Sequence, residues 1–196
     1  MTETIKEFAI ANIARVDFVI EGDESKTYSL VDVASEAESI AYLSEGEQDI
    51  LRVKNTIKAQ NNTEDIVLGY DNRFVNATLV PEILALVDGG ELTYGADDEV
   101  EEYIAPELGS PVERQKFTTR VYTEEKDGDG STVSYVCFEY KNCVGTPVNF
   151  TLQDGEFFAP ELNVRSRSKL GERPMKAKFL KELPDGSDED TGGVEG

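Results

Sequence analysis

The stretch that decides the fold class is Arg15-Val16-Asp17-Phe18-Val19-Ile20-Glu21, in which apolar and charged side chains alternate. In an extended chain, Val16, Phe18 and Ile20 lie on one face, and the charged side chains lie on the other. A period of two is typical of an antiparallel strand with one face in a core and one face in water. The stretch therefore predicts a β-strand.

The same period recurs in Leu51-Arg52-Val53-Lys54-Asn55-Thr56-Ile57-Lys58. Interpreted as one strand, this stretch places Leu51, Val53 and Ile57 on one face and its basic side chains on the other. So many strands predict a mainly β fold, a β-sandwich or barrel of packed antiparallel sheets. Further strands are predicted near residues 26–31, 37–44, 64–70, 115–125, 132–141, 148–152, 156–166 and 176–179.

Two turns are predicted between these strands. Asp127-Gly128-Asp129-Gly130-Ser131 separates two runs rich in aromatic and β-branched residues, and Asp-Gly supplies the positive φ that a tight hairpin needs. The same residues begin like a calcium loop, but Phe138 stands where that loop needs a bidentate Glu. We therefore interpret the segment as a hairpin turn. A second turn is predicted at Gln153-Asp154-Gly155-Glu156.

One helix is predicted at about residues 80–88, flanking the sheets. Pro81 suits a first helical turn, and Gly89-Gly90 ends the helix with a left-handed cap. A short amphipathic helix among strands covers an open sheet end or edge, and binding to a partner is the alternative. Its apolar stripe consists of Ile83, Leu84, Leu86 and Val87.

The remaining segments divide the chain into one domain and one tail. Residues 1–183 are predicted to form the domain, with a long hairpin loop at about 44–64 that we expect to be mobile in the monomer. Residues 95–112 are predicted to be an acidic loop bounded by prolines. Residues 184–196 contain almost nothing apolar, which predicts a disordered acidic tail.

The composition excludes several classes of chemistry. Histidine and tryptophan are absent, and forty Asp and Glu against nineteen Lys and Arg give a net charge of −21. Without histidine there is no Ser-His pair, Cys-His pair or His-rich metal site. Carboxylate pairs such as Glu101-Glu102 arise from composition alone and do not indicate a glycosidase. We predict that the protein is not an enzyme, with no catalytic residue, no cofactor and no metal.

Cys137 and Cys143 are expected to be reduced core thiols, because disulfides are rare in cytosolic proteins. A disulfide between them is the alternative. The chain does not begin with a basic segment followed by an apolar run, and no stretch of about 18 apolar residues could span a bilayer. We expect a protein that is made in a cytoplasm and has no membrane partner.

Positive charge gathers between Arg165 and Lys181, against the acidic background. This cluster has few aromatic side chains for base stacking, and the net charge opposes binding to phosphates. Basic strands that pair with the acidic surface of another copy are the simpler interpretation, since charge complementarity sets register and partner choice. Head-to-tail contacts of this kind close into rings or extend into filaments.

Five segments occur in order along the chain: Val80–Gly90, Pro111–Phe117, Val121–Lys126, Tyr140–Cys143 and Gly145–Glu161. In order and number they resemble the tail tube (major tail) proteins of siphophages and prophages of Gram-positive bacteria. The resemblance covers roughly residues 12–183. It consists of packing and turn motifs rather than catalytic ones.

The resemblance implies a tail-tube-like sandwich or barrel with one flanking helix, and hexameric rings that stack into a tube through which DNA passes without specific binding. The implied partners are copies of the chain and other tail proteins (tape measure, tail terminator and distal tail), and the implied location is the virion tail, after synthesis in the host bacterial cytoplasm. One alternative is the inner tube of a phage-tail-like bacteriocin or secretion device. Another is a small acidic β-sandwich binding module, with calcium dependence as one form of that alternative.

Two sets of residues follow as candidate assembly sites. From the charge imbalance we expect carboxylates to line the bore, where they repel DNA over a Debye length of about 8–10 Å. We expect five basic side chains at subunit contacts or outside the tube: Arg52, Lys54, Lys58, Lys176 and Lys178. By resemblance, the long hairpin mediates ring stacking, with an ordinary surface hairpin as the alternative, and its candidate residues are Lys58, Gln60, Asn61, Asn62, Thr63 and Glu64.

Overall fold

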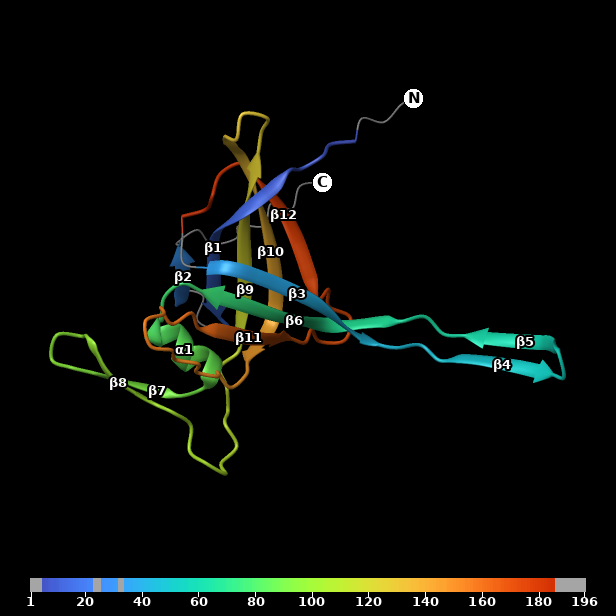
Figure 1. Cartoon of the computed structure of the whole chain (residues 1–196), viewed down its shortest axis with the longest axis horizontal. Coiled ribbons are helices and arrows are strands. Elements are labelled where there is room, and N and C mark those ends of the chain that lie inside the picture. Colours follow the sequence, from blue (N-terminus) through green and yellow to red (C-terminus); the bar gives the residue numbers. More distant parts are fainter. Residues whose placement is uncertain (1–4, 23–25, 32–33, 186–196) are drawn as a thin grey trace.

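A computed structural model describes residues 5–22, 26–31 and 34–185. Within these ranges the chain forms twelve strands and one helix (Figure 1). The predicted mainly β class, with antiparallel sheets and one α-helix, is confirmed. In chain order the elements are β1 (Ile10–Ile20), β2 (Thr27–Val31), β3 (Ala34–Ser44), β4 (Gln48–Val53), β5 (Thr56–Asn62), β6 (Ile66–Asn76), α1 (Pro81–Asp88), β7 (Glu91–Tyr94), β8 (Val100–Ile104), β9 (Phe117–Lys126), β10 (Thr132–Gly145), β11 (Glu161–Ser166) and β12 (Met175–Leu180).

Eight strands form one antiparallel sheet in the order β2-β1-β9-β10-β11-β6-β3, with β12 also paired to β10. One side of β10 is shared, because residues 135–140 pair with β12 and residues 143–145 pair with β11. Between these parts the register against β9 shifts, and Asn142 has a φ of 50°. A strand that bends at such an irregularity can belong to two packed sheets. The sheet therefore divides into two halves, β2-β1-β9-β10-β12 and β11-β6-β3.

The core lies between the two halves. In Figure 1, β3, β6 and β11 run across β1, β9 and β10. Phe18 of β1 is fully buried, and its ring centroid lies 5.9 Å from that of Phe74 on β6 and 5.6 Å from that of Phe117 on β9. Edge-to-face aromatic contacts of this kind add to the burial of apolar area. The Phe18 ring thus joins both halves of the sandwich.

Helix α1 closes one end of this core. It begins at Pro81 and ends at Gly89, whose φ is 84° and whose N–H donates to the carbonyl oxygen of Ala85 at 2.9 Å. The buried Val87 packs against the end of β10, where a Cβ on Gly145 would lie 2.1 Å from the Val87 carbonyl oxygen. Glycine at 145 is therefore required for this approach of helix and strand.

The interpretation of residues 51–58 as one strand is wrong. The chain reverses at Lys54-Asn55, and β4 pairs with β5. Because Arg52 is opposite Ile57 and Val53 is opposite Thr56, Ile57 lies on the face of Arg52 rather than on that of Val53. Lys54 adopts a φ of 53°, in the left-handed region, which is uncommon for lysine, so the residue type does not predict a turn there.

Two further strand predictions need correction near the C-terminal end of β10. Residues 148–152 form no strand, because the Val148 N–H donates to the Asp88 side chain at 2.9 Å and the Phe150 ring stacks on Phe158 in a loop. The strand predicted at 156–166 is limited to β11, Glu161–Ser166. Both predicted turns are present, with Asp127 and Gln153 accepting the hydrogen bonds that close them.

The predicted loop at 95–112 contains a strand, since β8 pairs with β7. Of the predicted acidic tail, residues 186–196 lie outside the described residues. Pro184 is placed against the sheet, because its carbonyl oxygen accepts a hydrogen bond from Arg15 Nη1 at 2.7 Å. The described chain therefore includes residues 184 and 185 of the predicted tail.

Candidate assembly site

The main feature outside the core is a two-stranded extension, residues 45–65, which carries β4 and β5 and is called the arm below (Figure 1). The chain passes from β3 into β4 and from β5 into β6, so the arm continues the β3–β6 pair. Its stem is closed by Thr63 N–H to the Glu47 carbonyl at 3.0 Å and by Glu47 N–H to Thr63 Oγ1 at 2.7 Å. At about 3.3 Å per residue, an arm of about ten residues on each side extends about 30 Å.

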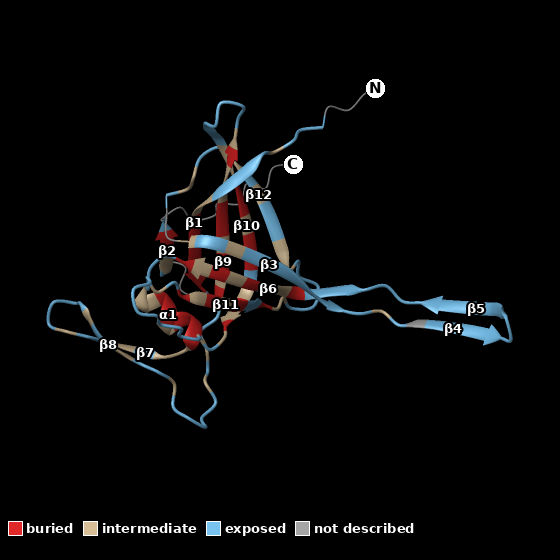
Figure 2. Cartoon of the chain, viewed as in Figure 1, coloured by how far each residue is buried: buried red, intermediate tan, exposed pale blue. Residues whose placement is uncertain are grey.

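No second layer covers the arm within the described chain. Every described side chain from residue 49 to residue 68 is exposed (Figure 2). Leu51 and Val53 share one face with 59% and 49% of their surface exposed, and Ile50 and Ile57 lie on the opposite face. An isolated two-stranded hairpin is marginally stable in water. The arm is therefore an exposed hairpin with no core of its own in the described chain.

Apolar exposure continues from the arm to its base on β3 and β6. Exposed apolar side chains that are grouped in this way mark interaction surfaces more often than single ones do. Leu43 is opposite Val67 in the β3–β6 pair, and because successive side chains of a strand point to opposite faces, the exposed apolar residues are divided between the two faces of this pair. These residues are Ile40, Tyr42, Leu43, Ile66, Val67 and Leu68.

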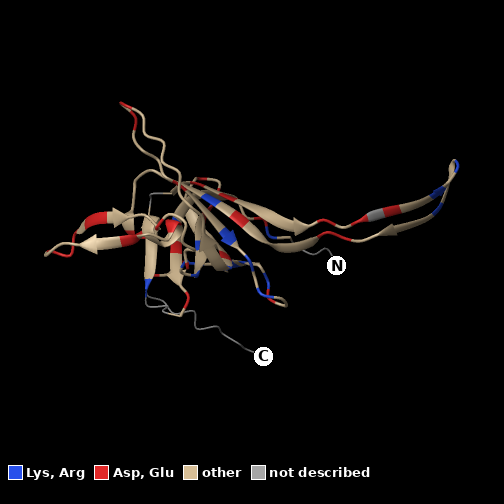
Figure 3. Cartoon of the chain, turned by 90° about the horizontal axis from the view of Figure 1, so that it is seen from below, with Lys and Arg blue, Asp and Glu red and all other residues tan. Residues whose placement is uncertain are grey.

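The basic residues predicted at subunit contacts fall into two separate groups. Arg52, Lys54 and Lys58 lie together at the end of the arm, where Figure 3 shows positive charge. Lys176 and Lys178 lie on β12, away from the arm (Figure 1). Their roles in subunit contact remain predictions.

The residues predicted to stack rings are spread along one side of the arm. Lys58 is the bulged residue near the turn, and Thr63 and Glu64 belong to the stem. Gln60 Nε2 donates to Asn62 Oδ1 at 3.1 Å within β5, and Asn61 is opposite Asp49. The six residues thus run from tip to base rather than forming a compact site, and their stacking role is untested.

A row of alternating charges crosses four strands on the side of the sheet away from the core. Asp17 on β1, Arg120 on β9, Glu139 on β10 and Lys176 on β12 occupy neighbouring register positions. Glu139 is only 3% exposed, and both Arg120 Nε and Lys178 Nζ lie 3.2 Å from its carboxylate. The geometry therefore engages Lys178 within its own chain. This face is largely neutralised by internal pairs.

Cys137 lies on this same side of β10, and Cys143 lies in the core. Both are buried free thiols. Burial raises the pKa of each thiol from 9.0 to about 11, which suppresses thiolate chemistry at neutral pH. Among the described residues there is no group of three or more Cys, Asp or Glu side chains arranged to hold a metal ion.

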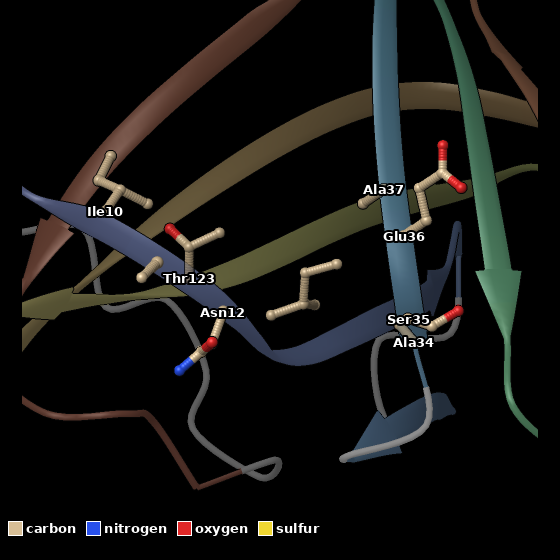
Figure 4. Close-up of a pocket in the computed structure, with 9 residues that line it drawn as sticks. Ile10, Asn12, Ala34, Ser35, Glu36, Ala37 and Thr123 are labelled. Atoms are coloured by element: carbon tan, nitrogen blue, oxygen red, sulfur yellow. The ribbon is translucent and has the colours of Figure 1, made fainter.

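The sheet has an open edge between β1 and β3. β1 pairs with β2 only from Arg15 to Val19, and in the described residues β3 pairs only with β6. The first residues of β1 and β3 border a groove of about 620 Å³ (Figure 4). Its lining is mostly small side chains, including Ala34, Ala37 and Thr123. Open edges of this kind accept a strand from another chain.

The end of the molecule opposite the arm carries the β7–β8 hairpin, residues 91–104, called the acidic hairpin below (Figure 1). The Tyr103 hydroxyl donates to Asp88 at the end of α1, and the Asp88 carboxylate also accepts the Val148 N–H. Burial, followed by this contact with Asp88, raises the pKa of Tyr103. A Cβ on Gly90 would lie 2.4 Å from the Tyr103 ring. The base of the acidic hairpin is therefore held closely against the helix.

Beside the acidic hairpin lies a groove of about 300 Å³ bounded by α1, β2 and β7. Its lining combines apolar side chains with Glu82 on the helix and with Lys26, whose Nζ lies 5.7 Å from the centroid of the Tyr28 ring. We call it the receiving groove. Its apolar lining includes Ile20, Tyr28, Leu86, Leu92 and Tyr94.

The structure is similar to a chain of the cryo-EM structure of the anti-feeding prophage (AFP) baseplate, 6-fold symmetrised. The TM-score is 0.45 and the sequence identity is 9%, over 91% of this chain and 97% of that chain. Similarity at this level carries no argument about function. No protein-family model matches the sequence, and no curated protein matches it. In the part of the chain that the structure describes, the one helix falls far short of the length that a bilayer requires.

Proposed function

We propose that this chain is a structural subunit of a phage tail tube, which assembles with copies of itself and has no enzymatic activity. The subunits form stacked rings, hexameric by resemblance to tail tube proteins, and the rings enclose a passage for DNA. Other tail proteins bound the tube at its ends. The virion tail is the corresponding location.

The observation that carries this proposal is the arm. Leu51, Val53 and Ile57 are each about half exposed on a hairpin with no second layer in the described chain. Covering the exposed half of one such side chain at an interface is worth about 1 kcal/mol, which is large compared with the marginal stability of an isolated hairpin. Contacts with other copies supply that burial, and the open edge at the groove between β1 and β3 offers a place for strands to join across subunits.

The charge balance gives the tube a mechanism as a conduit. Each exposed Lys or Arg in a bore would bind phosphate and release counterions, so many of them would hold the DNA. A net charge of −21 instead favours a wall that repels it. Carboxylates are proposed to line the bore, with the basic end of the arm at a subunit contact. A bore dominated by Lys and Arg, seen by cryo-electron microscopy of the assembled tube, would refute this arrangement.

The proposal is tested by negative-stain microscopy and sedimentation of the purified chain over a range of concentrations. Hollow rods at high concentration are the expected result for the wild type. Because β4 and β5 pair with each other, the matched variant removes both strands by replacing residues 46–63 with Asn-Gly. That variant should keep the cooperative urea unfolding of the wild type and remain monomeric. A wild type that is monomeric at every concentration, or a shortened variant that still forms rods, contradicts the proposal.

A further inference from the structure

The two ends of the molecule carry opposite charge. Within the arm, Arg52, Lys54 and Lys58 gather at the tip, and residues 50–63 contain no Asp or Glu. The acidic hairpin contains no Lys or Arg. Figure 3 shows positive charge at the end of the arm and negative charge at the opposite end of the molecule. The exposed carboxylates of the acidic hairpin belong to Glu91, Asp97, Asp98, Glu99, Glu101 and Glu102.

We propose that the arm of one copy docks in the receiving groove of a second copy, against its acidic hairpin. This inference rests on the proposed function and names the contact by which one subunit holds the next. The occupant of the groove is the Leu51 and Val53 face of the arm. The basic tip of the arm then meets the carboxylates of the acidic hairpin.

The apolar parts of the two surfaces match. Leu51 and Val53 lie side by side on one face of the arm, and both are exposed. The receiving groove offers Leu92 and the half-exposed Tyr94 on β7, together with Leu86 on α1. Aromatic side chains beside an apolar groove are typical of the centre of an interface.

The charged parts fix the direction in which the arm enters. Glu82 and Lys26 both line the groove, so its own lining carries no net charge, and the excess of carboxylates lies on the acidic hairpin, whose Leu92 and Tyr94 line the groove. In a chain with a net charge of −21, two copies repel each other over most of their surfaces. The basic tip attracts carboxylates instead, so it favours the acidic end of its neighbour over other orientations.

The base of the acidic hairpin and the base of the arm are both fixed by hydrogen bonds within their own copy. The acidic hairpin is anchored to α1 through Tyr103 and Asp88, and the stem of the arm is closed by the hydrogen bonds of Glu47 and Thr63. Ordering the acidic hairpin on binding therefore costs little conformational entropy. Because the two surfaces differ and lie at opposite ends, the contact is heterologous and propagates from copy to copy.

The test reverses the charges of each surface in the full-length chain. The arm variant is Arg52→Glu, Lys54→Asp and Lys58→Glu, with Asp at 54 because Asp tolerates the positive φ there. The groove variant is Asp97→Lys, Glu99→Lys and Glu102→Lys, which leaves Asp98 and its φ of 58° unchanged. Sedimentation velocity measures assembly of each variant alone and of an equal mixture.

Matched controls change the net charge equally at other exposed positions. Lys6→Glu, Lys116→Glu and Lys141→Glu match the arm variant, because they lie outside both the arm and the basic cluster at 165–181, and Glu107→Lys, Asp154→Lys and Glu156→Lys match the groove variant. Three surface pairs of about 0.5 kcal/mol each correspond to roughly a tenfold change in affinity, and repulsion increases it. Each reversal alone should therefore raise the concentration for assembly at least about tenfold, and the controls should not.

Mixing the two reversed variants decides the proposal. In the mixture, the acidic arm of the arm variant meets the basic hairpin of the groove variant. The native basic arm of the groove variant meets the native acidic hairpin of the arm variant, so assembly should return to near the wild-type concentration. If the mixture assembles no better than its components, or if the reversals act no differently from their controls, the docking proposal is overturned while the proposed function stands. Duplex DNA binding is measured on the same variants. If the arm reversal removes DNA binding and leaves assembly unchanged, the basic tip binds a polyanion, and the docking proposal is overturned too. A wild type that never assembles refutes both.

Discussion

β1 belongs to the eight-stranded sheet with α1, called the body below, and β5 belongs to the arm. Both strands are extended, but most of β1 is buried and β5 is exposed. From Val16 to Ile20 every residue of β1 is buried, whereas every residue of β5 is exposed. The difference is that β1 has a second half-sheet packed on one face, while in the described chain the arm has only its own two strands. Apolar residues stabilise a strand only where a second layer covers them.

This comparison separates folding from assembly. The body carries the residues that determine the free energy of unfolding, with Phe18, Phe74 and Phe117 at its centre. The arm carries apolar side chains that contribute little in the monomer, because they are exposed there. Substitutions in the body should therefore change stability, and substitutions in the arm should change self-association.

The largest effect on stability is expected from Phe18→Ala. The ring is fully buried and contacts aromatic rings from both halves of the sheet, so its loss leaves a cavity. Replacement of a buried Phe by Ala costs about 3–5 kcal/mol. Urea unfolding followed by circular dichroism measures the change. A loss below about 1 kcal/mol would show that the two halves do not share this core.

Alkaline pH should destabilise the body by a comparable amount. The pKa of Cys137 and that of Cys143 are raised from 9.0 to about 11 because both thiols are buried. The unfolded chain loses these protons near pH 9 and the folded chain keeps them to about pH 11, so stability is lost as pH rises from 9 to 11. Two pKa units correspond to about 2–3 kcal/mol for each thiol.

Urea unfolding between pH 8 and pH 11 tests this dependence. A Cys137→Ala, Cys143→Ala variant should show a flatter loss of stability over the same range than the wild type. Removal of the arm should leave the slope unchanged, because its charged groups are exposed. If the double variant and the wild type lose stability in parallel, the buried thiols are not the cause.

Much of the body follows from sequence patterns, and the exceptions have specific causes. The alternation of apolar and charged residues correctly predicts β1, because Val16 and Phe18 are buried in the core between the two halves of the sheet. The alternation at 148–152 misleads, because the Val148 N–H is taken by Asp88, a contact between residues far apart in sequence. Acidic composition hides β8, in which Tyr103 is fixed by the same Asp88.

The surfaces that we propose for assembly are harder to predict from the sequence. Lys54 takes the left-handed conformation without being Gly or Asn, so the reversal between β4 and β5 had no local signal. The sequence shows how many basic residues there are, but not which of them are paired within the chain. Lys178 pairs with Glu139, whereas Arg52 lies near the tip of the arm. Only the fold separates these two uses of positive charge.

A smaller effect on stability is expected where the acidic hairpin joins the body. Asp88→Ala removes the acceptor of the Tyr103 hydroxyl and leaves the Val148 N–H without its partner. An unsatisfied buried donor costs about 1–3 kcal/mol. Tyr103→Phe is the milder control, since it keeps the ring against Gly90. Hydrogen exchange should accelerate in residues 91–104 of the Asp88→Ala variant, and unchanged exchange there would show that Asp88 does not anchor the hairpin.

The smallest effect on stability, and a clear effect on assembly, is expected from Leu51→Ser with Val53→Ser. Both side chains are about half exposed in the monomer, so the free energy of unfolding should stay within about 0.5 kcal/mol of the wild type. Assembly should require at least about tenfold more protein, because apolar area that is buried between copies is lost. Val133→Ser is the matched control, since Val133 is 52% exposed at the far end of β10. If that control impairs sedimentation of assemblies as strongly as the arm variant does, then exposed apolar surface acts without regard to position, and the arm has no special part in joining copies.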